Sequence, residues 1–290
     1  MTDFNKCDNV FLEIYPNKEY VDTIKNYINK NSRKVKFYYN FCKKGRWEVA
    51  LSKSPLLKLS LVYLYLPTVK EKYNKKGIPE KIFYDTMSDI KIWIDDHKMR
   101  TNEIGLYELN WIMHHMNMNI FKLGELQFQK STYYFNPQYN KNGISVRFGN
   151  KAINTHIPRN VDFTSENCDK SFSMAKEFFS KYYSDYPTNF FMCHSWMLYS
   201  KNAEFMKKDS NILSFAKRFN IVNEMENPSQ AYLWIFGKKE SSSKLILHRK
   251  KYGTYGNTDN LKCETSLQKS LIEYIKNGGI LGDTMGIYIS

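Results

Sequence analysis

The fold of this 290-residue chain is decided by Asn189-Phe190-Phe191-Met192-Cys193-His194-Ser195-Trp196-Met197-Leu198. This stretch is short, apolar and rich in aromatic residues, a pattern that predicts a buried β-strand. Successive side chains of a strand point to opposite faces of the sheet. His194 therefore shares a face with Met192 and Trp196, whereas Cys193 shares the other face with Ser195. The two neighbours cannot serve each other as nucleophile and base, so any chemistry at His194 needs a partner from elsewhere in the chain.

The composition is close to that of an ordinary globular protein, with 42% hydrophobic and 25% charged residues. No apolar run approaches the length of a transmembrane helix. The N-terminal residues Met1-Thr2-Asp3-Phe4-Asn5 lack the basic and then apolar pattern of a signal peptide. These features predict a cytoplasmic protein without a membrane span.

Cysteine and histidine spacing gives no sign of a disulfide framework or of a metal site. The five cysteines are scattered without a C-x-x-C pair, and the six histidines include no H-E-x-x-H motif. An odd number of sparse cysteines in a non-secreted chain is typical of reduced thiols. We therefore expect free thiols and no metal cofactor.

The net charge of +14 raises the question of nucleic-acid binding. The lysines are dispersed, and clusters such as Lys70-Glu71-Lys72 are interrupted by acidic residues. Lys, Asn, Ile and Tyr are abundant together, as expected of AT-rich coding DNA. The pattern favours a general basic surface over a nucleic-acid interface, although such a surface would attract a phosphorylated ligand.

The first part of the chain, residues 1–118, shows the three-to-four-residue apolar period of helices. The stretch from Val35 to Cys42 is ambiguous between helix and strand. The predicted helices cover Tyr20–Ile28, Leu56–Leu66 limited by Pro67, a segment that starts at Pro79, and Gly105–Met118.

From residue 119 onward the period changes to two, and strands alternate with helices. A phase slip near Gly124 predicts a β-bulge within Phe121–Gln129. The further predicted strands are Tyr133–Phe135, Ile144–Phe148, Ala152–Ile157, Tyr232–Phe236, Leu245–Leu247 and Met285–Ile289. Helices are predicted to start near Thr164 or Ser165, at Ser210 and at the capping box Thr265–Gln268. The helix that starts at Ser210 is predicted to carry Phe219 on its apolar face. The chain is therefore predicted to be α+β: a helical N-terminal domain, 1–118, followed by a mixed β-sheet domain with flanking helices, 119–290.

Two of these strands and the helix between them form a βαβ unit, so the strands should be parallel. His156 ends the first strand, at the edge where open α/β sheets bind their ligands. The loop from Pro158 to Glu166 leads into the helix, whose first amide groups could bind a pyrophosphate. With His156 and His194 facing the reaction, this arrangement suits acyl transfer from a thioester carrier.

Each of these side chains also has a structural interpretation. His194 is either a core histidine held by a backbone carbonyl or a general base that removes a proton from an incoming amine. Cys193 is either a small apolar filler or an acyl-accepting nucleophile. Trp196 is a core residue or a pocket wall, and Ser210 caps its helix while Asn211 could reach a cofactor or substrate.

A series of short segments beyond about residue 54 follows in a characteristic order. They are Gly77–Glu80, Asp85–Ile90, Gly105–Leu109 with Trp111, Phe121–Phe128, His156–Pro158, Cys193–Trp196, Ser210–Ile212, Phe236-Gly237 and Thr265–Gln268. In this order and spacing they resemble a family of bacterial acyltransferases that combine an N-acyltransferase N-terminal domain with a GNAT-like C-terminal domain.

The resemblance implies a GNAT-like sheet that splays between its two central parallel strands, where the pantetheine of acyl-CoA would lie. It also implies transfer of the acyl group to an amine or a similar acceptor, with acyl-CoA as co-substrate. The residues assigned on this basis are His156 and His194 for catalysis, Arg159, Asn160, Thr164, Ser165 and Asn211 for cofactor binding, and Gln127, Trp196 and Ser210 for substrate binding.

Three hypotheses of function follow. The leading one is a histidine-assisted N-acyltransferase that acts on acyl-CoA and a small-molecule acceptor. Because Arg159-Asn160-Val161-Asp162-Phe163 occupies the place of the glycine-containing phosphate loop of better-known GNAT enzymes, an acyl-carrier protein stays open as the donor. The second hypothesis is a non-catalytic module that binds acyl-CoA or an acyl carrier, and the third is a nucleic-acid-binding protein.

Overall fold

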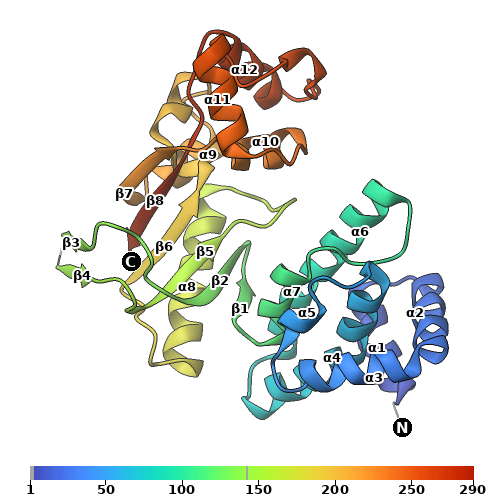
Figure 1. The fold of residues 1–290 in the computed structure, drawn as a ribbon. Helices are drawn as coiled ribbons and strands as arrows, with labels where there is room; N and C mark the ends of the chain where they lie inside the picture. Colours follow the sequence, from blue (N-terminus) through green and yellow to red (C-terminus); the bar gives the residue numbers. More distant parts are fainter. Residues whose placement is uncertain (1–2, 142) are drawn as a thin grey trace. The chain divides into compact units, whose positions relative to one another are not determined.

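The computed structural model of this protein describes residues 3–141 and 143–290, which form two compact units (Figure 1). One unit contains the residues up to Gln129 together with Ile157–Val161. The other contains Lys130–His156 and Asp162–Ser290. Met1 and Thr2, from the N-terminal segment considered above, lie outside the described residues. The boundary between residues 118 and 119 that the sequence predicts remains a prediction.

The first unit is mainly helical, as predicted, and ends in a β-hairpin. Its central helix is α4, which is buried on most sides because α1, α2 and α3 all pack against it. The ambiguous stretch from Val35 to Cys42 is helical. The elements are α1 (Phe4–Ile14), α2 (Lys18–Lys30), α3 (Ser32–Cys42), the short η1 (Trp47–Ala50), α4 (Pro55–Lys75), α5 (Glu80–Met87), α6 (Asp89–Thr101), α7 (Leu109–Met116), β1 (Ile120–Leu123) and β2 (Leu126–Thr132).

The predicted end of the second helix at Leu66 is wrong, because α4 continues through Pro67 to Lys75. A proline inside a helix removes one hydrogen bond and costs about 3 kcal/mol. Beyond it, however, Val69 and Tyr73 are both 0% exposed. Burying large apolar side chains gains about 1.5–3 kcal/mol each, so packing offsets the local cost of the proline.

Two local predictions at the end of this unit are also corrected. The helix predicted from Gly105 begins only at Leu109. A side chain at Gly105 would come within 2.6 Å of Pro55, so this glycine lets two segments of the chain approach closely. The slip at Gly124 is a tight turn instead of a bulge, because Leu123 and Leu126 are register partners of a hairpin.

A buried carboxylate, Asp89, joins three side chains of this unit. It accepts hydrogen bonds from the indole nitrogens of Trp111 (2.6 Å) and Trp93 (3.1 Å). His115 Nε2 lies 3.3 Å from the same oxygen. Burial alone would raise the pKa of Asp89, but the contacts with His115 and the two indoles outweigh it and hold this pKa below its ordinary value.

The second unit is built on a mixed sheet whose strands run in the order β5-β6-β8-β7. The first two strands are parallel and are connected through α8, which confirms the βαβ unit, while β8 pairs antiparallel with both β6 and β7. A helical part followed by a mixed sheet with flanking helices is the predicted α+β fold. The elements are β5 (Lys151–His156), α8 (Ser165–Tyr182), β6 (Phe190–Ser195), η2 (Trp196–Leu198), η3 (Ser200–Glu204), α9 (Asn211–Ala216), β7 (Phe219–Glu226) and β8 (Gly282–Ile289).

The two faces of this sheet are covered by different segments. On one face Phe172 of α8 packs on Phe191 and Tyr288, with ring centroids 5.3 and 4.2 Å away. On the other face lies the chain before β5, which carries the small hairpin of β3 (Tyr139–Lys141) and β4 (Ile144–Val146). The buried residues of that second face are Tyr133, Phe135, Tyr139, Ile144, Val146, Ala152, Phe190, Met192 and Ile287.

Between β7 and β8 the chain forms a helical insertion with its own apolar core, residues 228–281, which we call the helical cap. Two strands predicted here are helices, because Pro228 starts one helix and Ala231, Tyr232 and Phe236 are buried at helical spacing. The helices of the cap are α10 (Pro228–Phe236), α11 (Ser242–Tyr252), the short η4 (Thr258–Asn260) and α12 (Ser266–Lys276).

The remaining differences concern element ends. Phe219 begins β7 instead of extending the helix that starts after Ser210. The chain leaves the strand conformation at Tyr133–Phe135, and Phe148 lies beyond the end of β4. None of the helices that the structure describes combines the length and apolarity needed to cross a membrane.

Replacement of the buried carboxylate tests the packing of the first unit. Asp89→Asn should lower the free energy of unfolding by about 3–5 kcal/mol, because it removes one partner of a buried charged network. Asp85→Asn is the matched control, since the Asp85 carboxylate forms a surface ion pair with Lys81 and its loss should lower the free energy of unfolding by less than about 0.5 kcal/mol. Urea unfolding followed by tryptophan fluorescence measures the free energy of unfolding of both variants. Equal losses in the two variants would contradict a stabilising role of the buried Asp89 network.

The contacts of Asp89 with His115 and the two indoles also predict how the stability of the protein depends on pH. A depressed pKa in the folded state means that Asp89 contributes its full stabilisation above its unfolded pKa of about 3.9. The contribution is lost as the pH falls through the folded value. The stability difference between the wild-type protein and Asp89→Asn should therefore shrink on acidification. A difference that does not change with pH would contradict the conclusion that the ionised form of Asp89 stabilises the folded protein.

Candidate functional site

The two histidines singled out in the sequence occupy the carboxyl ends of neighbouring parallel strands. Asn154 of β5 is the register partner of Met192 of β6. His156 and His194 each follow two residues later, so the two-residue period of a strand brings both to the same face. This face is the one covered by the β3–β4 segment, where the ring of Phe135 lies 6.4 Å from that of His194, edge to face.

Cys193 points to the opposite face, as the alternation of strand side chains predicts. Its side chain is 0% exposed, and burial raises the pKa of its thiol to about 12. A thiol with this pKa carries almost no thiolate at neutral pH and is a poor nucleophile. The structure therefore favours the apolar filler over an acyl-cysteine intermediate.

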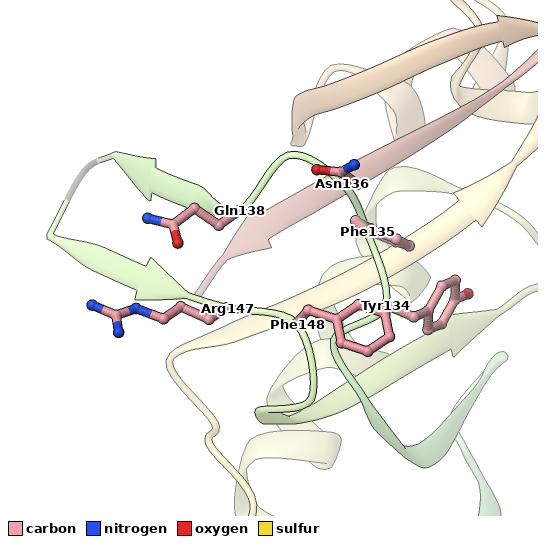
Figure 2. Close-up of a pocket in the computed structure, with 6 residues that line it drawn as sticks. All are labelled: Tyr134, Phe135, Asn136, Gln138, Arg147 and Phe148. Atoms are coloured by element: carbon pink, nitrogen blue, oxygen red, sulfur yellow. The ribbon is translucent and has the colours of Figure 1, made fainter.

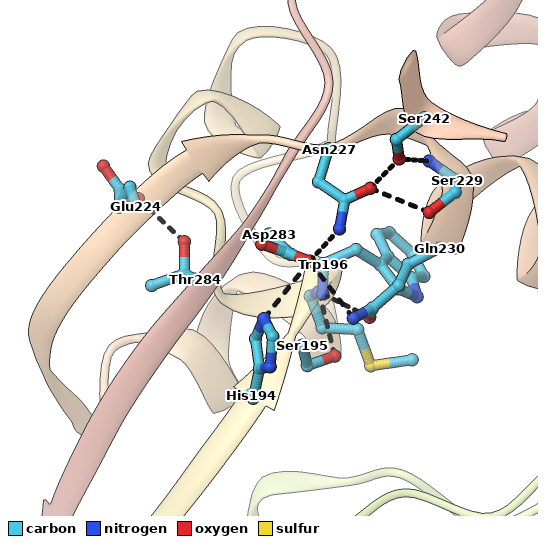
Figure 3. A network of polar contacts seen from close by, with 11 residues as sticks. His194, Ser195, Trp196, Glu224, Asn227, Ser229, Gln230, Ser242, Asp283 and Thr284 are labelled. Atoms are coloured by element: carbon cyan, nitrogen blue, oxygen red, sulfur yellow. Dashed lines mark hydrogen bonds and ion pairs between the residues drawn. The ribbon is translucent and has the colours of Figure 1, made fainter. Parts of the chain in front are cut away.

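A carboxylate that the sequence analysis did not identify, Asp283, lies beside His194 (Figure 3). In the antiparallel pair of β6 and β8, His194 stands opposite Met285. Asp283 lies two residues before Met285 on β8 and so shares this face. Its Oδ2 is 3.2 Å from Nε2 of His194, within ion-pair range. Asp283 is 0% exposed, whereas the side chain of His194 is 24% exposed.

Two carboxamides hold the same oxygen of Asp283. Asn227 Nδ2 donates to Oδ2 at 2.5 Å and Gln230 Nε2 at 3.2 Å. Gln230 also accepts the backbone N–H of Trp196 at 3.1 Å. Asn227 and Gln230 flank the start of α10, so the beginning of the helical cap is tied to the end of β6. No signal in the sequence marked Asp283, because it lies just before the strand predicted from Met285 to Ile289, whereas β8 begins at Gly282.

The imidazole of His156 has a different neighbour, Asn154, which lies two residues earlier on the same strand. Asn154 Nδ2 is 3.1 Å from His156 Nε2. The amide is buried and faces the ring, so it donates to the Nε2 lone pair. The two histidines are thus held by different kinds of group, a carboxamide and a carboxylate.

The start of α8 carries a cation as well as free amide groups. Thr164 caps the helix, because its hydroxyl accepts the N–H of Asn167 at 3.3 Å. Ser165 accepts two hydrogen bonds from Arg218 Nη2, at 2.6 Å through its hydroxyl and 2.9 Å through its carbonyl. Arg218 also pairs with Asp169 at 2.8 Å. This arginine, which the sequence analysis did not select, adds positive charge at a helix N-terminus.

Three predicted site residues belong to the first unit. Arg159 Nη1 pairs with Asp96 at 2.9 Å, and its guanidinium lies over the ring of Trp93. Asn160 has a left-handed backbone, with φ of 59°. Gln127 of β2 is buried, and its Nε2 has no hydrogen-bond partner within the described chain.

The other predicted residues lie in the second unit. Trp196 is buried and follows the last residue of β6, in the turn η2, so it no longer shares the strand alternation with His194. The Ser210 hydroxyl accepts the N–H of Ile212 at 3.2 Å and caps α9, and Asn211 is exposed at the first position of that helix.

An open pocket of about 620 Å³ lies on the segment that covers this face (Figure 2). Its lining residues are Tyr134, Phe135, Asn136, Gln138, Arg147 and Phe148. Phe135 contributes to this pocket and also contacts His194. The described residues include no group of three or more His, Cys, Asp or Glu side chains arranged to hold a metal ion.

Comparisons with known proteins agree with this architecture. Residues 19–118 match the model of an N-acyltransferase N-terminal domain, and residues 120–288 match that of a GNAT-like C-terminal domain. No curated protein matches the sequence significantly.

Similar solved structures include an acyltransferase in complex with decanoyl-CoA and teicoplanin, and an acyltransferase mutant in complex with octanoyl-CoA. Each has a TM-score of 0.65 and 19% sequence identity, over 80% of this chain and 66% of the other. This chain thus spans just under two thirds of the length of these proteins, and the likeness shows a shared fold.

Thiol accessibility gives a direct test of the environment of Cys193. Of the five free cysteines, Cys263 is exposed and the other four are buried. In the native protein one thiol should react with a thiol reagent such as Ellman's, and all five should react after unfolding. Cys263→Ser should abolish the native reaction. Rapid labelling of Cys193, located by mass spectrometry, would contradict its burial.

Proposed function

Since this chain belongs to the family that joins an N-acyltransferase N-terminal domain to a GNAT-like C-terminal domain, we propose that it transfers an acyl group from acyl-CoA to an amine. The observation that carries the proposal is the placement of His156 and His194 on one face, at the carboxyl ends of adjacent parallel strands. The acyl-CoA found with the similar solved structures supports the choice of donor. A bacterial origin and a cytoplasmic location are also part of this proposal.

The proposed reaction needs one base and produces one thiol. The amine nitrogen attacks the thioester carbonyl, so a C–N bond forms and the C–S bond breaks. The nitrogen loses a proton and the CoA sulfur gains one. His194 is the proposed base, because its imidazole is partly exposed and a neutral imidazole accepts a proton near neutral pH. His156 is the second proposed catalytic residue.

The start of α8 is the proposed position of the CoA pyrophosphate. The helix N-terminus, capped by Thr164, and the Arg218 guanidinium at Ser165 both favour an anion there. Arg159, Asn160 and Asn211 remain proposed cofactor contacts, and Gln127, Trp196 and Ser210 remain proposed acceptor contacts.

Acyl transfer can be tested by mass spectrometry of reactions with a panel of acyl-CoAs and amines. His194→Ala should reduce kcat by about 10²–10⁴, the usual contribution of a general base. His248→Ala is the matched control, because His248 lies in α11 and bonds the backbone at Thr254. Its activity should equal that of the wild-type protein.

Other outcomes of that experiment separate the alternatives. Thermal stabilisation by acyl-CoA without product would indicate a binding module. Product formed only with acyl-carrier thioesters would indicate a carrier-protein donor. Binding to DNA or RNA that weakens steeply with salt, without product or acyl-CoA binding, would overturn the proposal in favour of nucleic acid.

The proposed binding of the CoA pyrophosphate by Arg218 at the start of α8 can be tested separately. Arg218→Ala should weaken acyl-CoA binding about 10-fold or more, the equivalent of one charged hydrogen bond. It should leave kcat/KM with an acyl-N-acetylcysteamine thioester unchanged, because this donor has no phosphate. Lys217→Ala, at the exposed neighbouring position, should change neither value. Equal losses with both donors would show that Arg218 acts through folding alone.

A further inference from the structure

We infer that Asp283 positions His194 and fixes the imidazole tautomer in which Nδ1 is free to accept a proton, which makes Asp283 a positioning residue of the acyl transfer. This role rests on the proposed function of His194. Asp283 comes from β8, and it follows His194 of β6 by 89 residues in the sequence (283 − 194).

The placement of Asp283 is costly unless a partner compensates for it. Removing a carboxylate from water costs several kcal/mol, and Asp283 has no exposed surface. No lysine or arginine among the described residues forms an ion pair with it, and the groups that face its Oδ2 are the imidazole of His194 and the carboxamides of Asn227 and Gln230. The alternation of β8 brings Asp283 to the face of His194, because Met285, two residues on, stands opposite that histidine.

The direction of the contact selects the tautomer. A carboxylate can only accept, so Nε2 of His194, 3.2 Å from Oδ2, must carry a proton for the contact to be favourable. In a neutral imidazole the lone pair is then on Nδ1. Nε2 is buried and makes no other polar contact within the described residues: it has no hydrogen bond of standard geometry, and the 3.2 Å ion-pair contact with Oδ2 is what faces it. The exposed part of this side chain therefore lies elsewhere on the ring. Nδ1 is therefore the nitrogen that accepts the proton of the amine, and the carboxylate stabilises the imidazolium that forms.

The carboxylate is itself held from the helical cap. Asn227 and Gln230 both donate to Oδ2, and Gln230 also holds the backbone of Trp196 just after β6. Asn227 is oriented in turn, because its Oδ1 accepts the hydroxyls of Ser229 and Ser242. The chain of contacts fixes Asp283 relative to the strand end that carries His194 (Figure 3). Oδ1 of Asp283 accepts no hydrogen bond within the described chain, which leaves acceptor capacity beside the ring.

Asp283→Asn is the decisive variant, because asparagine keeps the size of the side chain and can turn an amide donor toward Nε2. We expect kcat to fall about 100-fold or more with the KM for both substrates unchanged. Gln230→Ala, which keeps the carboxylate and removes one of its donors, should lower kcat about fivefold. Glu224→Gln is the matched control, because Glu224 of β7 accepts hydrogen bonds from Thr284 of β8 and Ser200 of η3 and, among the described residues, forms no hydrogen bond or ion pair with His194.

The tautomer is read directly from the ¹⁵N shifts of His194 in labelled protein, assigned by comparison with His194→Ala. The wild-type protein and Glu224→Gln should show the proton on Nε2, and Asp283→Asn should show it on Nδ1. A wild-type protein with the proton on Nδ1 overturns the inference, even if Asp283→Asn does not fold. An Nε2 proton in a protein without acyltransferase activity would refute the proposed function and leave the assignment of the tautomer to Asp283 intact.

Discussion

The alternation of side chains along β6 is the constraint on which the second unit depends. Met192 and His194 point to one face of the sheet, and Phe191 and Cys193 point to the other. Because the period is two, a shift by one residue would exchange the two sets of side chains between the faces and turn His194 to the face that now holds Cys193. The parallel register with β5 and the antiparallel register with β8 keep that shift from occurring.

The two faces differ because different segments cover them. Phe172 of α8 packs over Phe191 and Tyr288 on one face, to which the fully buried Cys193 also points. The segment before β5 closes the other, with Phe135 beside His194. Burial on one face makes the Cys193 thiol inert, whereas the cover on the other face leaves the His194 imidazole partly exposed. The chemical roles available to two adjacent residues therefore follow from which segment packs on each side.

The sequence predicted the architecture where local and long-range forces agree. The change from helical to strand period near residue 119, the βαβ unit around α8 and the capping box at Thr265 all appear in the structure. Prediction was wrong where tertiary packing outweighs propensity. Helix α4 passes through Pro67 because the residues beyond it are buried, and the aromatic run ending at Phe236 is helical because it packs within the cap.

For the candidate site, the sequence by itself determined that His194 and Cys193 face apart and that His156 ends a strand parallel to that of His194. These conclusions need only the pleat of a strand and the connection through one helix. Only the tertiary structure decided which groups hold the imidazoles. Asp283 reaches His194 because β8 pairs with β6, and Asn227 and Gln230 hold Asp283 from the start of the helical cap. Strand pairing between distant segments leaves no periodic signal in the sequence, so this carboxylate could be found only in the folded chain.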